Sequence, residues 1–119
     1  AFYTRRSGLQ ADARADSAAE VARLVRARDR LGLEAALVVT VPVPEGFEVD
    51  EAVMEESLSE ALAVAASRGI SGRELTPFLL AHMSWRSGGA TLRANLALLE
   101  NNARVAAEVA VALASPIIL

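Results

Sequence analysis

The sequence predicts an α/β fold in which helices predominate. Apolar residues make up 53% of the 119 residues, and many of them are alanines, which favour helices. Larger apolar residues recur at helical spacing in several segments. Residues 35–39 instead form an unbroken apolar run, which is typical of a central strand covered on both faces. This length and composition fit one globular unit.

The first helix is predicted to follow an irregular polar stretch, residues 5–16, and a β-prone opening, residues 1–4. Asp16 or Ser17 supplies the N-cap, and Glu20 stands three residues after Ser17, as in a capping box. Apolar residues then recur at helical spacing, and Gly32 ends the helix.

Glu34 to Val41 is predicted to be the buried strand. Pro42 and Pro44 end it, because proline lacks a backbone donor for the sheet, so residues 42–46 should form a loop. Sheets usually contain about four to six strands, and this chain offers at most one other candidate strand. We therefore expect the missing strands to belong to another chain or to an absent upstream segment.

Three further helices are predicted. Asp50 caps the first of them, which ends at Arg68-Gly69, and the next runs from Thr76-Pro77 to about Trp85. Gly88-Gly89 separates it from a long helix over Thr91 to Ala114. That helix carries an apolar stripe suited to packing on a sheet or another helix: Leu92, Leu96, Leu99, Ala103, Ala106, Ala110 and Leu113.

The composition excludes several kinds of chemistry. The net charge is −3, so a nucleic-acid or anionic membrane partner is not expected. No apolar run approaches the roughly 18 residues of a membrane span. The chain has no cysteine, which fits a reducing cytoplasm, and His82 is its single histidine, so thiolate or multi-histidine metal sites are not expected. All twelve basic residues are arginines, and therefore no lysine can form an imine here.

Asparagines are the most informative polar residues, because Asn95, Asn101 and Asn102 are poor helix formers inside a predicted helix. At about 100° per residue, Asn95 and Asn102 lie within roughly 20° of each other and border the apolar stripe, whereas Asn101 points elsewhere. Buried amides need partners. The two amides therefore either bind adjacent loop backbone or present donors and acceptors to a ligand.

Other candidates fit structural roles better. His82 could act as a base, but no partner is visible in the sequence, so packing or a surface role is preferred. Arg23, Arg26 and Arg30 follow helical spacing and could bind phosphate, although a solvated helix face with pairing to Asp29 is preferred.

Several short motifs occur in an order that resembles the pseudouridine-5'-phosphate glycosidases, also called the indigoidine synthase A-like family. In chain order they are Ala1-Phe2-Tyr3-Thr4-Arg5, Arg14-Ala15-Asp16-Ser17, Pro42-Val43-Pro44-Glu45, Gly69-Ile70-Ser71-Gly72, Thr76-Pro77-Phe78-Leu79-Leu80, Gly88-Gly89, and Asn95 followed by Asn101-Asn102-Ala103. The resemblance covers almost the whole chain. One departure is Thr40-Val41-Pro42, where many relatives have Ala-Asn-Pro.

The resemblance implies that residues 1–119 are the C-terminal part of one three-layer α/β/α domain in a protein of about three hundred residues. It implies a cytoplasmic, manganese-dependent homotrimer that reversibly cleaves the C–C glycosidic bond of pseudouridine 5'-phosphate, giving uracil and ribose 5-phosphate. A lysine that forms an imine, a glutamate that handles protons and the Mn²⁺ ligands belong to the family's N-terminal part. This lysine-free chain should be inactive without that part.

By the same resemblance, Asn95 corresponds to a family active-site residue that hydrogen-bonds the substrate, and Asn102 is a weaker substrate-binding candidate. The chain is therefore interpreted as one wall of the active site, with the N-terminal half of the same enzyme as its partner. One alternative is a diverged, non-catalytic fragment that serves as an interaction or assembly module. A second alternative, which is favoured least, is an independent helical binding domain, and it requires Leu37 to Val39 to be helical or exposed. An upstream segment with the lysine and carboxylates favours the enzyme, and a genuine start just before Ala1 favours the module.

Overall fold

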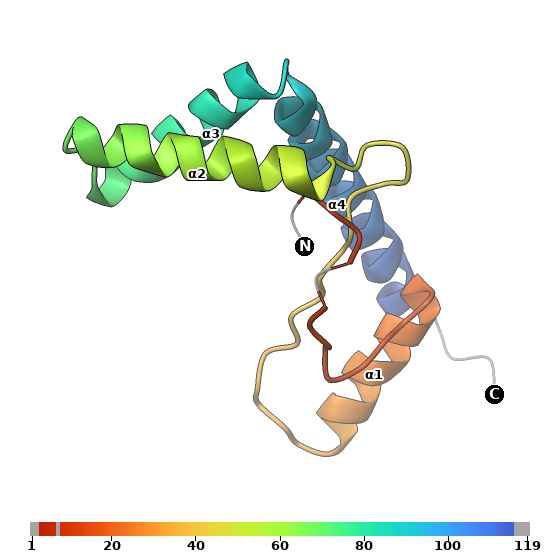
Figure 1. Ribbon diagram of the computed structural model, residues 1–119. Helices are drawn as coiled ribbons and strands as arrows, with labels where there is room; N and C mark the ends of the chain where they lie inside the picture. The colour runs from red at the N-terminus through yellow and green to blue at the C-terminus, as the bar shows by residue number, and fades with distance from the viewer. Residues whose placement is uncertain (1–2, 7, 116–119) are drawn as a thin grey trace. The chain divides into compact units, whose positions relative to one another are not determined.

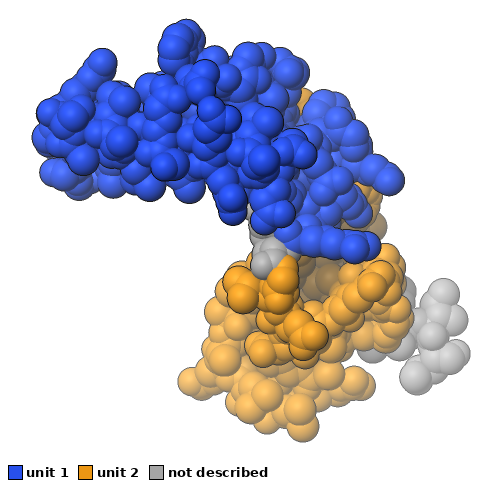
Figure 2. All heavy atoms as spheres, viewed as in Figure 1, with its two compact units in different colours: residues 1–7, 42–99 blue, residues 8–41, 100–119 orange. Residues whose placement is uncertain are grey.

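The computed structural model describes residues 3–6 and 8–115, and the regular structure within them is helical (Figure 1). The elements are α1 (Ala18–Arg30), α2 (Glu51–Ser67), the 3-10 helix η1 (Gly72–Glu74), α3 (Leu75–Arg86) and α4 (Ala90–Ala114). They form two compact units, the first built from residues 1–7 and 42–99 and the second from residues 8–41 and 100–119 (Figure 2). Helix α4 contributes residues to both units.

The predicted α/β fold, a part of a three-layer α/β/α domain with one buried strand, is wrong for the described residues. The expected strand, Glu34 to Val41, has no regular secondary structure, and Val38 at its centre is 83% exposed. A strand requires a neighbouring strand that pairs with its backbone groups. Nowhere in residues 3–6 and 8–115 does a segment supply that pairing. Tyr3 and Thr4 form no strand either, and the rest of the β-prone opening lies outside the described residues.

Helix α1 begins at the predicted cap. The Ser17 side chain accepts a hydrogen bond from the Glu20 backbone N–H, with Oγ and N 3.3 Å apart. The Glu20 carboxylate reaches back to the backbone N–H of Asp16, at 2.7 Å, rather than to Ser17 as in a standard capping box. Gly32 follows the helix at φ 67°, which confirms the predicted end.

Helix α2 also has the predicted ends. Asp50 Oδ1 accepts hydrogen bonds from the backbone N–H groups of the first turn, with the N–H of Ala52 at 3.0 Å. Gly69 adopts φ 66° after the last turn, and the Ile70 N–H then returns to the carbonyl of Ala65 at 2.9 Å. This is the closing geometry for which glycine is favoured.

Helices α3 and α4 follow with small differences from the expected bounds. Helix α3 continues from η1 at Leu75, so Thr76 lies inside it instead of capping it. Gly88 and Gly89 adopt φ values of 58° and 81° and separate α3 from α4, as predicted. Ser87 Oγ accepts a hydrogen bond from the backbone N–H of Thr91 at 3.2 Å, which fixes the start of α4.

The first unit has a small core beneath the pair of α2 and α3. Its buried members are Tyr3, Val43, Val49, Ala61, Met83 and Ala94, and Met54, Leu58, Leu79 and Ala90 pack against them. Tyr3 and Arg5 are held there by hydrogen bonds: Val49 N–H donates to Tyr3 O at 2.9 Å, and Arg5 Nη1 donates to Val43 O at 3.0 Å. The N-terminal segment is therefore part of this core.

The second unit contains α1 and the C-terminal part of α4. Arg26 of α1 donates from Nη2 to the carbonyl oxygens of Ala112, Leu113 and Ser115, at 2.8, 3.0 and 2.8 Å. The last carbonyls of a helix have no partner within the helix and carry partial negative charge. Arg26 therefore serves as a helix cap, whereas its sequence spacing suggested a solvated face or a phosphate patch.

Candidate functional site

Asn95 lies in the second turn of α4, and its side chain is half-buried. On one side of it along the helix surface, Thr91, Ala94 and Leu98 face the core of the first unit. On the other side is an exposed surface, which we call the leucine face: Leu92, Leu96 and Leu99, with exposed fractions of 50%, 52% and 56%. Asn95 thus borders both a buried and an exposed face of the same helix.

This placement corrects one detail of the sequence interpretation. The apolar stripe was expected to pack on a sheet or another helix, but the core of the first unit uses the adjacent face of α4, where the residues are mostly smaller. Small residues allow closer approach between a helix and its neighbours, and Ala94 is completely buried beside Met83. Leu92, Leu96 and Leu99 are consequently left on the surface, whereas Leu98 is buried.

The Asn95 carboxamide makes no hydrogen bond with any residue in the described part of the chain. It offers one carbonyl acceptor and two N–H donors from a helix whose start is held by Ser87 one turn earlier. A rigid helix holds a side chain more accurately than a loop does. Asn95 is therefore suited to contact a ligand, the second of the two roles left open by its sequence position.

Asn102 and Asn101 lie in the second unit, on the later part of α4. The Asn102 side chain is exposed. Asn101 accepts a hydrogen bond on Oδ1 from Arg104 Nη2 at 2.7 Å, and Arg104 also pairs with Glu108. Asn101 therefore has a local structural role on the helix surface.

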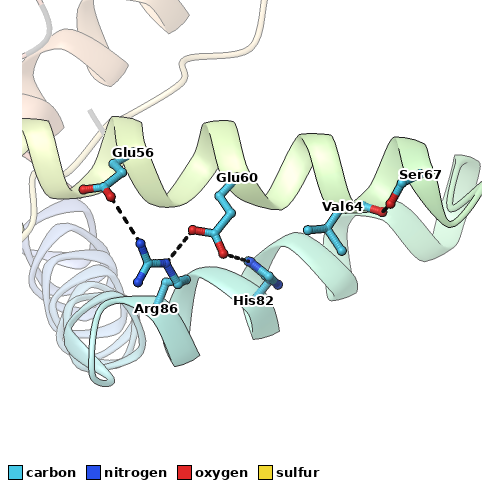
Figure 3. Close-up of polar contacts among 6 residues, drawn as sticks. All are labelled: Glu56, Glu60, Val64, Ser67, His82 and Arg86. Carbon is cyan, nitrogen blue, oxygen red and sulfur yellow. Dashed lines mark hydrogen bonds and ion pairs between the residues drawn. The ribbon is translucent and has the colours of Figure 1, made fainter.

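The main polar cluster of the first unit, the Glu60 cluster, consists of Glu56 and Glu60 of α2 with His82 and Arg86 of α3. Figure 3 shows Arg86 and His82 pointing toward Glu60 from the facing helix. Arg86 Nε donates to Glu60 Oε2 at 2.5 Å, and His82 Nε2 lies 3.3 Å from Glu60 Oε1. Arg86 Nη2 also donates to Glu56 at 3.2 Å. The cluster therefore links α2 to α3 through residues that are 26 positions apart in sequence, Glu60 and Arg86.

Partial burial raises the pKa of the Glu60 carboxyl, but the hydrogen bonds and positive charge of Arg86 and His82 lower it by more. The pKa of this carboxyl therefore lies below its ordinary value of 4.5, and Glu60 is ionised near neutral pH. An ionised glutamate engaged by an arginine is a poor proton donor. The cluster is consequently better suited to holding α2 and α3 together than to acid catalysis.

His82 also lies in a row of rings on α3. Its ring centroid is 5.7 Å from that of Phe78 and 5.8 Å from that of Trp85, and the Arg68 guanidinium lies over Phe78. These contacts fit the packing or surface role preferred for His82, but Glu60 is a partner that was not visible in the sequence. Glu60 and Arg86 were not among the candidates predicted from the sequence. The four-residue spacing of Glu56 and Glu60 was a possible signal, but their partner is 26 residues beyond Glu60.

The described residues contain no cluster of three or more histidine, aspartate or glutamate side chains that could hold a metal ion. In the same part of the chain, no helix is both long and apolar enough to cross a membrane.

Comparison with known proteins identifies similar chains. Residues 1–112 match the family model described as "Indigoidine synthase A like protein". The chain is 46% identical over 112 residues to a pseudouridine-5'-phosphate glycosidase of Kosmotoga olearia, covering 94% of this chain and 39% of that protein. It is 48% identical over 114 residues to the pseudouridine-5'-phosphate glycosidase of Rhodospirillum centenum, covering 96% of this chain and 36% of that protein.

A solved structure is also similar. The crystal structure of the prealnumycin C-glycosynthase AlnA in complex with ribulose 5-phosphate matches with a TM-score of 0.79 and 33% sequence identity. The match covers 94% of this chain and 37% of the AlnA chain. This chain thus spans less than two fifths of the length of each of these proteins.

Proposed function

The chain belongs to the indigoidine synthase A-like family, and from this membership we propose that it forms part of a pseudouridine-5'-phosphate glycosidase. The enzyme would break the bond between C5 of uracil and C1' of the ribose. Water is consumed in this direction, and uracil and ribose 5-phosphate are released; the reverse direction joins them and releases water.

The observation that carries this proposal is the identity of 46% and 48% to two proteins of that name over nearly the whole chain. The AlnA match gives separate support. That protein is a C-glycosynthase and is bound to a pentose 5-phosphate, which has the same chemical class as the sugar product proposed here.

Asn95 is the residue of this chain that we assign to the substrate. Its amide can both donate and accept hydrogen bonds, and it has no partner within the described residues. Uracil and the sugar hydroxyls present complementary groups. Asn102 is the secondary candidate, because its side chain is exposed and free to reach a ligand.

The described residues do not fit a manganese site, since they lack a cluster of ligands and the single histidine is engaged by Glu60. The absence of lysine from the sequence also means that this chain cannot supply an imine-forming amine. We therefore assign the Mn²⁺ ligands and the covalent chemistry to the rest of the enzyme, its N-terminal part. We further propose a cytoplasmic homotrimer.

The test is uracil release from pseudouridine 5'-phosphate in the presence of Mn²⁺. It compares the chain alone with a full-length chimera, in which this chain replaces the matching segment of the Rhodospirillum centenum glycosidase. We expect activity in the chimera and none in the chain alone. A folded chimera without activity would favour the alternative, a diverged non-catalytic assembly module.

Within the active chimera, Asn95→Ala should lower turnover at least tenfold, about 1.4 kcal/mol of barrier, because the substrate loses its contact with the amide. Asn101→Ala is the matched control on the same helix. Asn101 is engaged on the helix surface, where its Oδ1 accepts a hydrogen bond from Arg104, so turnover should stay near that of the unsubstituted chimera. Unchanged turnover in the Asn95 variant would remove this residue from the site.

A further inference from the structure

The leucine face of α4, formed by Leu92, Leu96 and Leu99, is apolar, helical and about half exposed. These residues are spaced four and three apart and so form a continuous strip along the helix. Single exposed leucines are common on soluble proteins, but a strip of three on one helix face is typical of an interaction surface.

We propose that the leucine face is the surface on which the remainder of the family domain packs. The occupant follows from the comparison with AlnA. The helices of this chain match part of that structure with a TM-score of 0.79, and more than three fifths of the AlnA chain lies outside the match. In AlnA, this arrangement of helices thus belongs to a much longer polypeptide. A tethered segment occupies such a face at high effective concentration.

Asn95 gives the proposal its functional consequence. Because this residue borders the leucine face, a segment that covers the leucines would enclose the Asn95 amide at the edge of the contact. An enclosed amide needs hydrogen-bond partners, and the described part of the chain provides none. The covering segment, or the substrate held by it, would provide them. Naming the covering segment as the rest of the family domain rests on the proposed function.

The test uses the absence of cysteine from this chain. Leu96→Cys places a single thiol on the leucine face, and its reaction rate with a maleimide reports how accessible that face is. Leu62→Cys is the matched control, a leucine of α2 with a similar exposed fraction, 45%. Each variant is prepared in the isolated chain and in the chimera with the Rhodospirillum centenum glycosidase. The labelled peptide is identified by mass spectrometry.

We expect labelling at Leu96→Cys to be at least about tenfold slower in the chimera than in the isolated chain, and labelling at Leu62→Cys to change less than about threefold. Equal rates in both proteins at Leu96→Cys would overturn the proposal, as would equal protection at both sites. A concentration-dependent protection of the isolated chain would assign the face to a second copy instead. A chimera that stays unfolded while its parent folds would also contradict the proposal.

This readout is independent of catalysis. Protection of Leu96→Cys in a folded but inactive chimera would support the docking surface and refute the proposed activity. An active chimera in which the leucine face stays accessible would support the proposed activity and refute the docking surface.

Discussion

Arg26 provides a direct test of how α4 is stabilised in the second unit. One guanidinium nitrogen, Nη2, donates to the carbonyl oxygens of Ala112, Leu113 and Ser115 at 2.8–3.0 Å. Arg26→Ala removes these contacts together and leaves the carbonyl end of α4 without its cation. The contacts join residues 86–89 positions apart in sequence, so the substitution also removes hydrogen bonds that link α1 to the end of α4.

The size of the effect follows from two contributions. A cation at a helix C-terminus contributes about 0.3–1 kcal/mol, and up to about 2 kcal/mol when the contact is partly buried. A hydrogen bond to a charged group contributes about 1.5–3 kcal/mol. Nη2 carries only two hydrogens, so the three contacts share them and do not add. We expect Arg26→Ala to lower the free energy of unfolding by about 1–2 kcal/mol.

The measurement is urea unfolding of the 119-residue chain followed by circular dichroism, with thermal unfolding as a second probe. The expected loss corresponds to a Tm about 4–8 °C lower. Arg30→Ala is the control, because Arg30 is also on α1 and is exposed, and it should change stability by less than about 0.5 kcal/mol. Equal effects of the two substitutions would refute the capping role of Arg26 and leave only a general charge effect.

Two other predictions concern the first unit. Since the folded-state pKa of Glu60 lies below 4.5, its ion pairs should stabilise the fold fully above that pH, and this stabilisation should be lost as the pH falls through the lowered pKa. Between about pH 5 and 3, the free energy of unfolding of the Glu60→Gln variant should therefore fall less steeply with pH than that of the unsubstituted chain. Equal pH dependence of the two proteins would contradict this. Gly69→Ala should lower the free energy of unfolding by about 1 kcal/mol, because a residue with a side chain is strained at φ 66° even where space is open. Ala66→Gly in the preceding turn is the comparison, since it measures the ordinary cost of a glycine inside a helix.

The helices were predictable because their signals are local. Ser17 and Asp50 cap from the positions expected, and Gly32, Gly69 and the double glycine end their helices at left-handed φ values. Each of these signals depends on hydrogen bonds among residues only a few positions apart. Their strength can therefore be judged from a short stretch of sequence.

The strand prediction failed because a strand is a property of two segments. The apolar run at residues 35–39 indicated that the segment avoids water, but it carried no information about a pairing partner. The same limit applies to the Glu60 cluster, since Arg86 lies 26 residues beyond Glu60 and nothing local links them. It also applies to α4. The periodic leucines lie on one helix face as predicted, but the residues of the neighbouring face are the ones that are buried in the core.

The placement of Asn95 explains how a chain without lysine or a metal cluster in its described part could still matter to catalysis. Catalysis requires groups that are held in the correct geometry as well as groups that react. Ser87 fixes the start of α4, Ala94 anchors the helix in the core, and Asn95 projects from between that core and the leucine face. Under the proposed function, the reactive groups would reside in the remainder of the enzyme, and that remainder would cover the leucine face. Substitutions on that face should then reduce turnover by displacing the Asn95 amide.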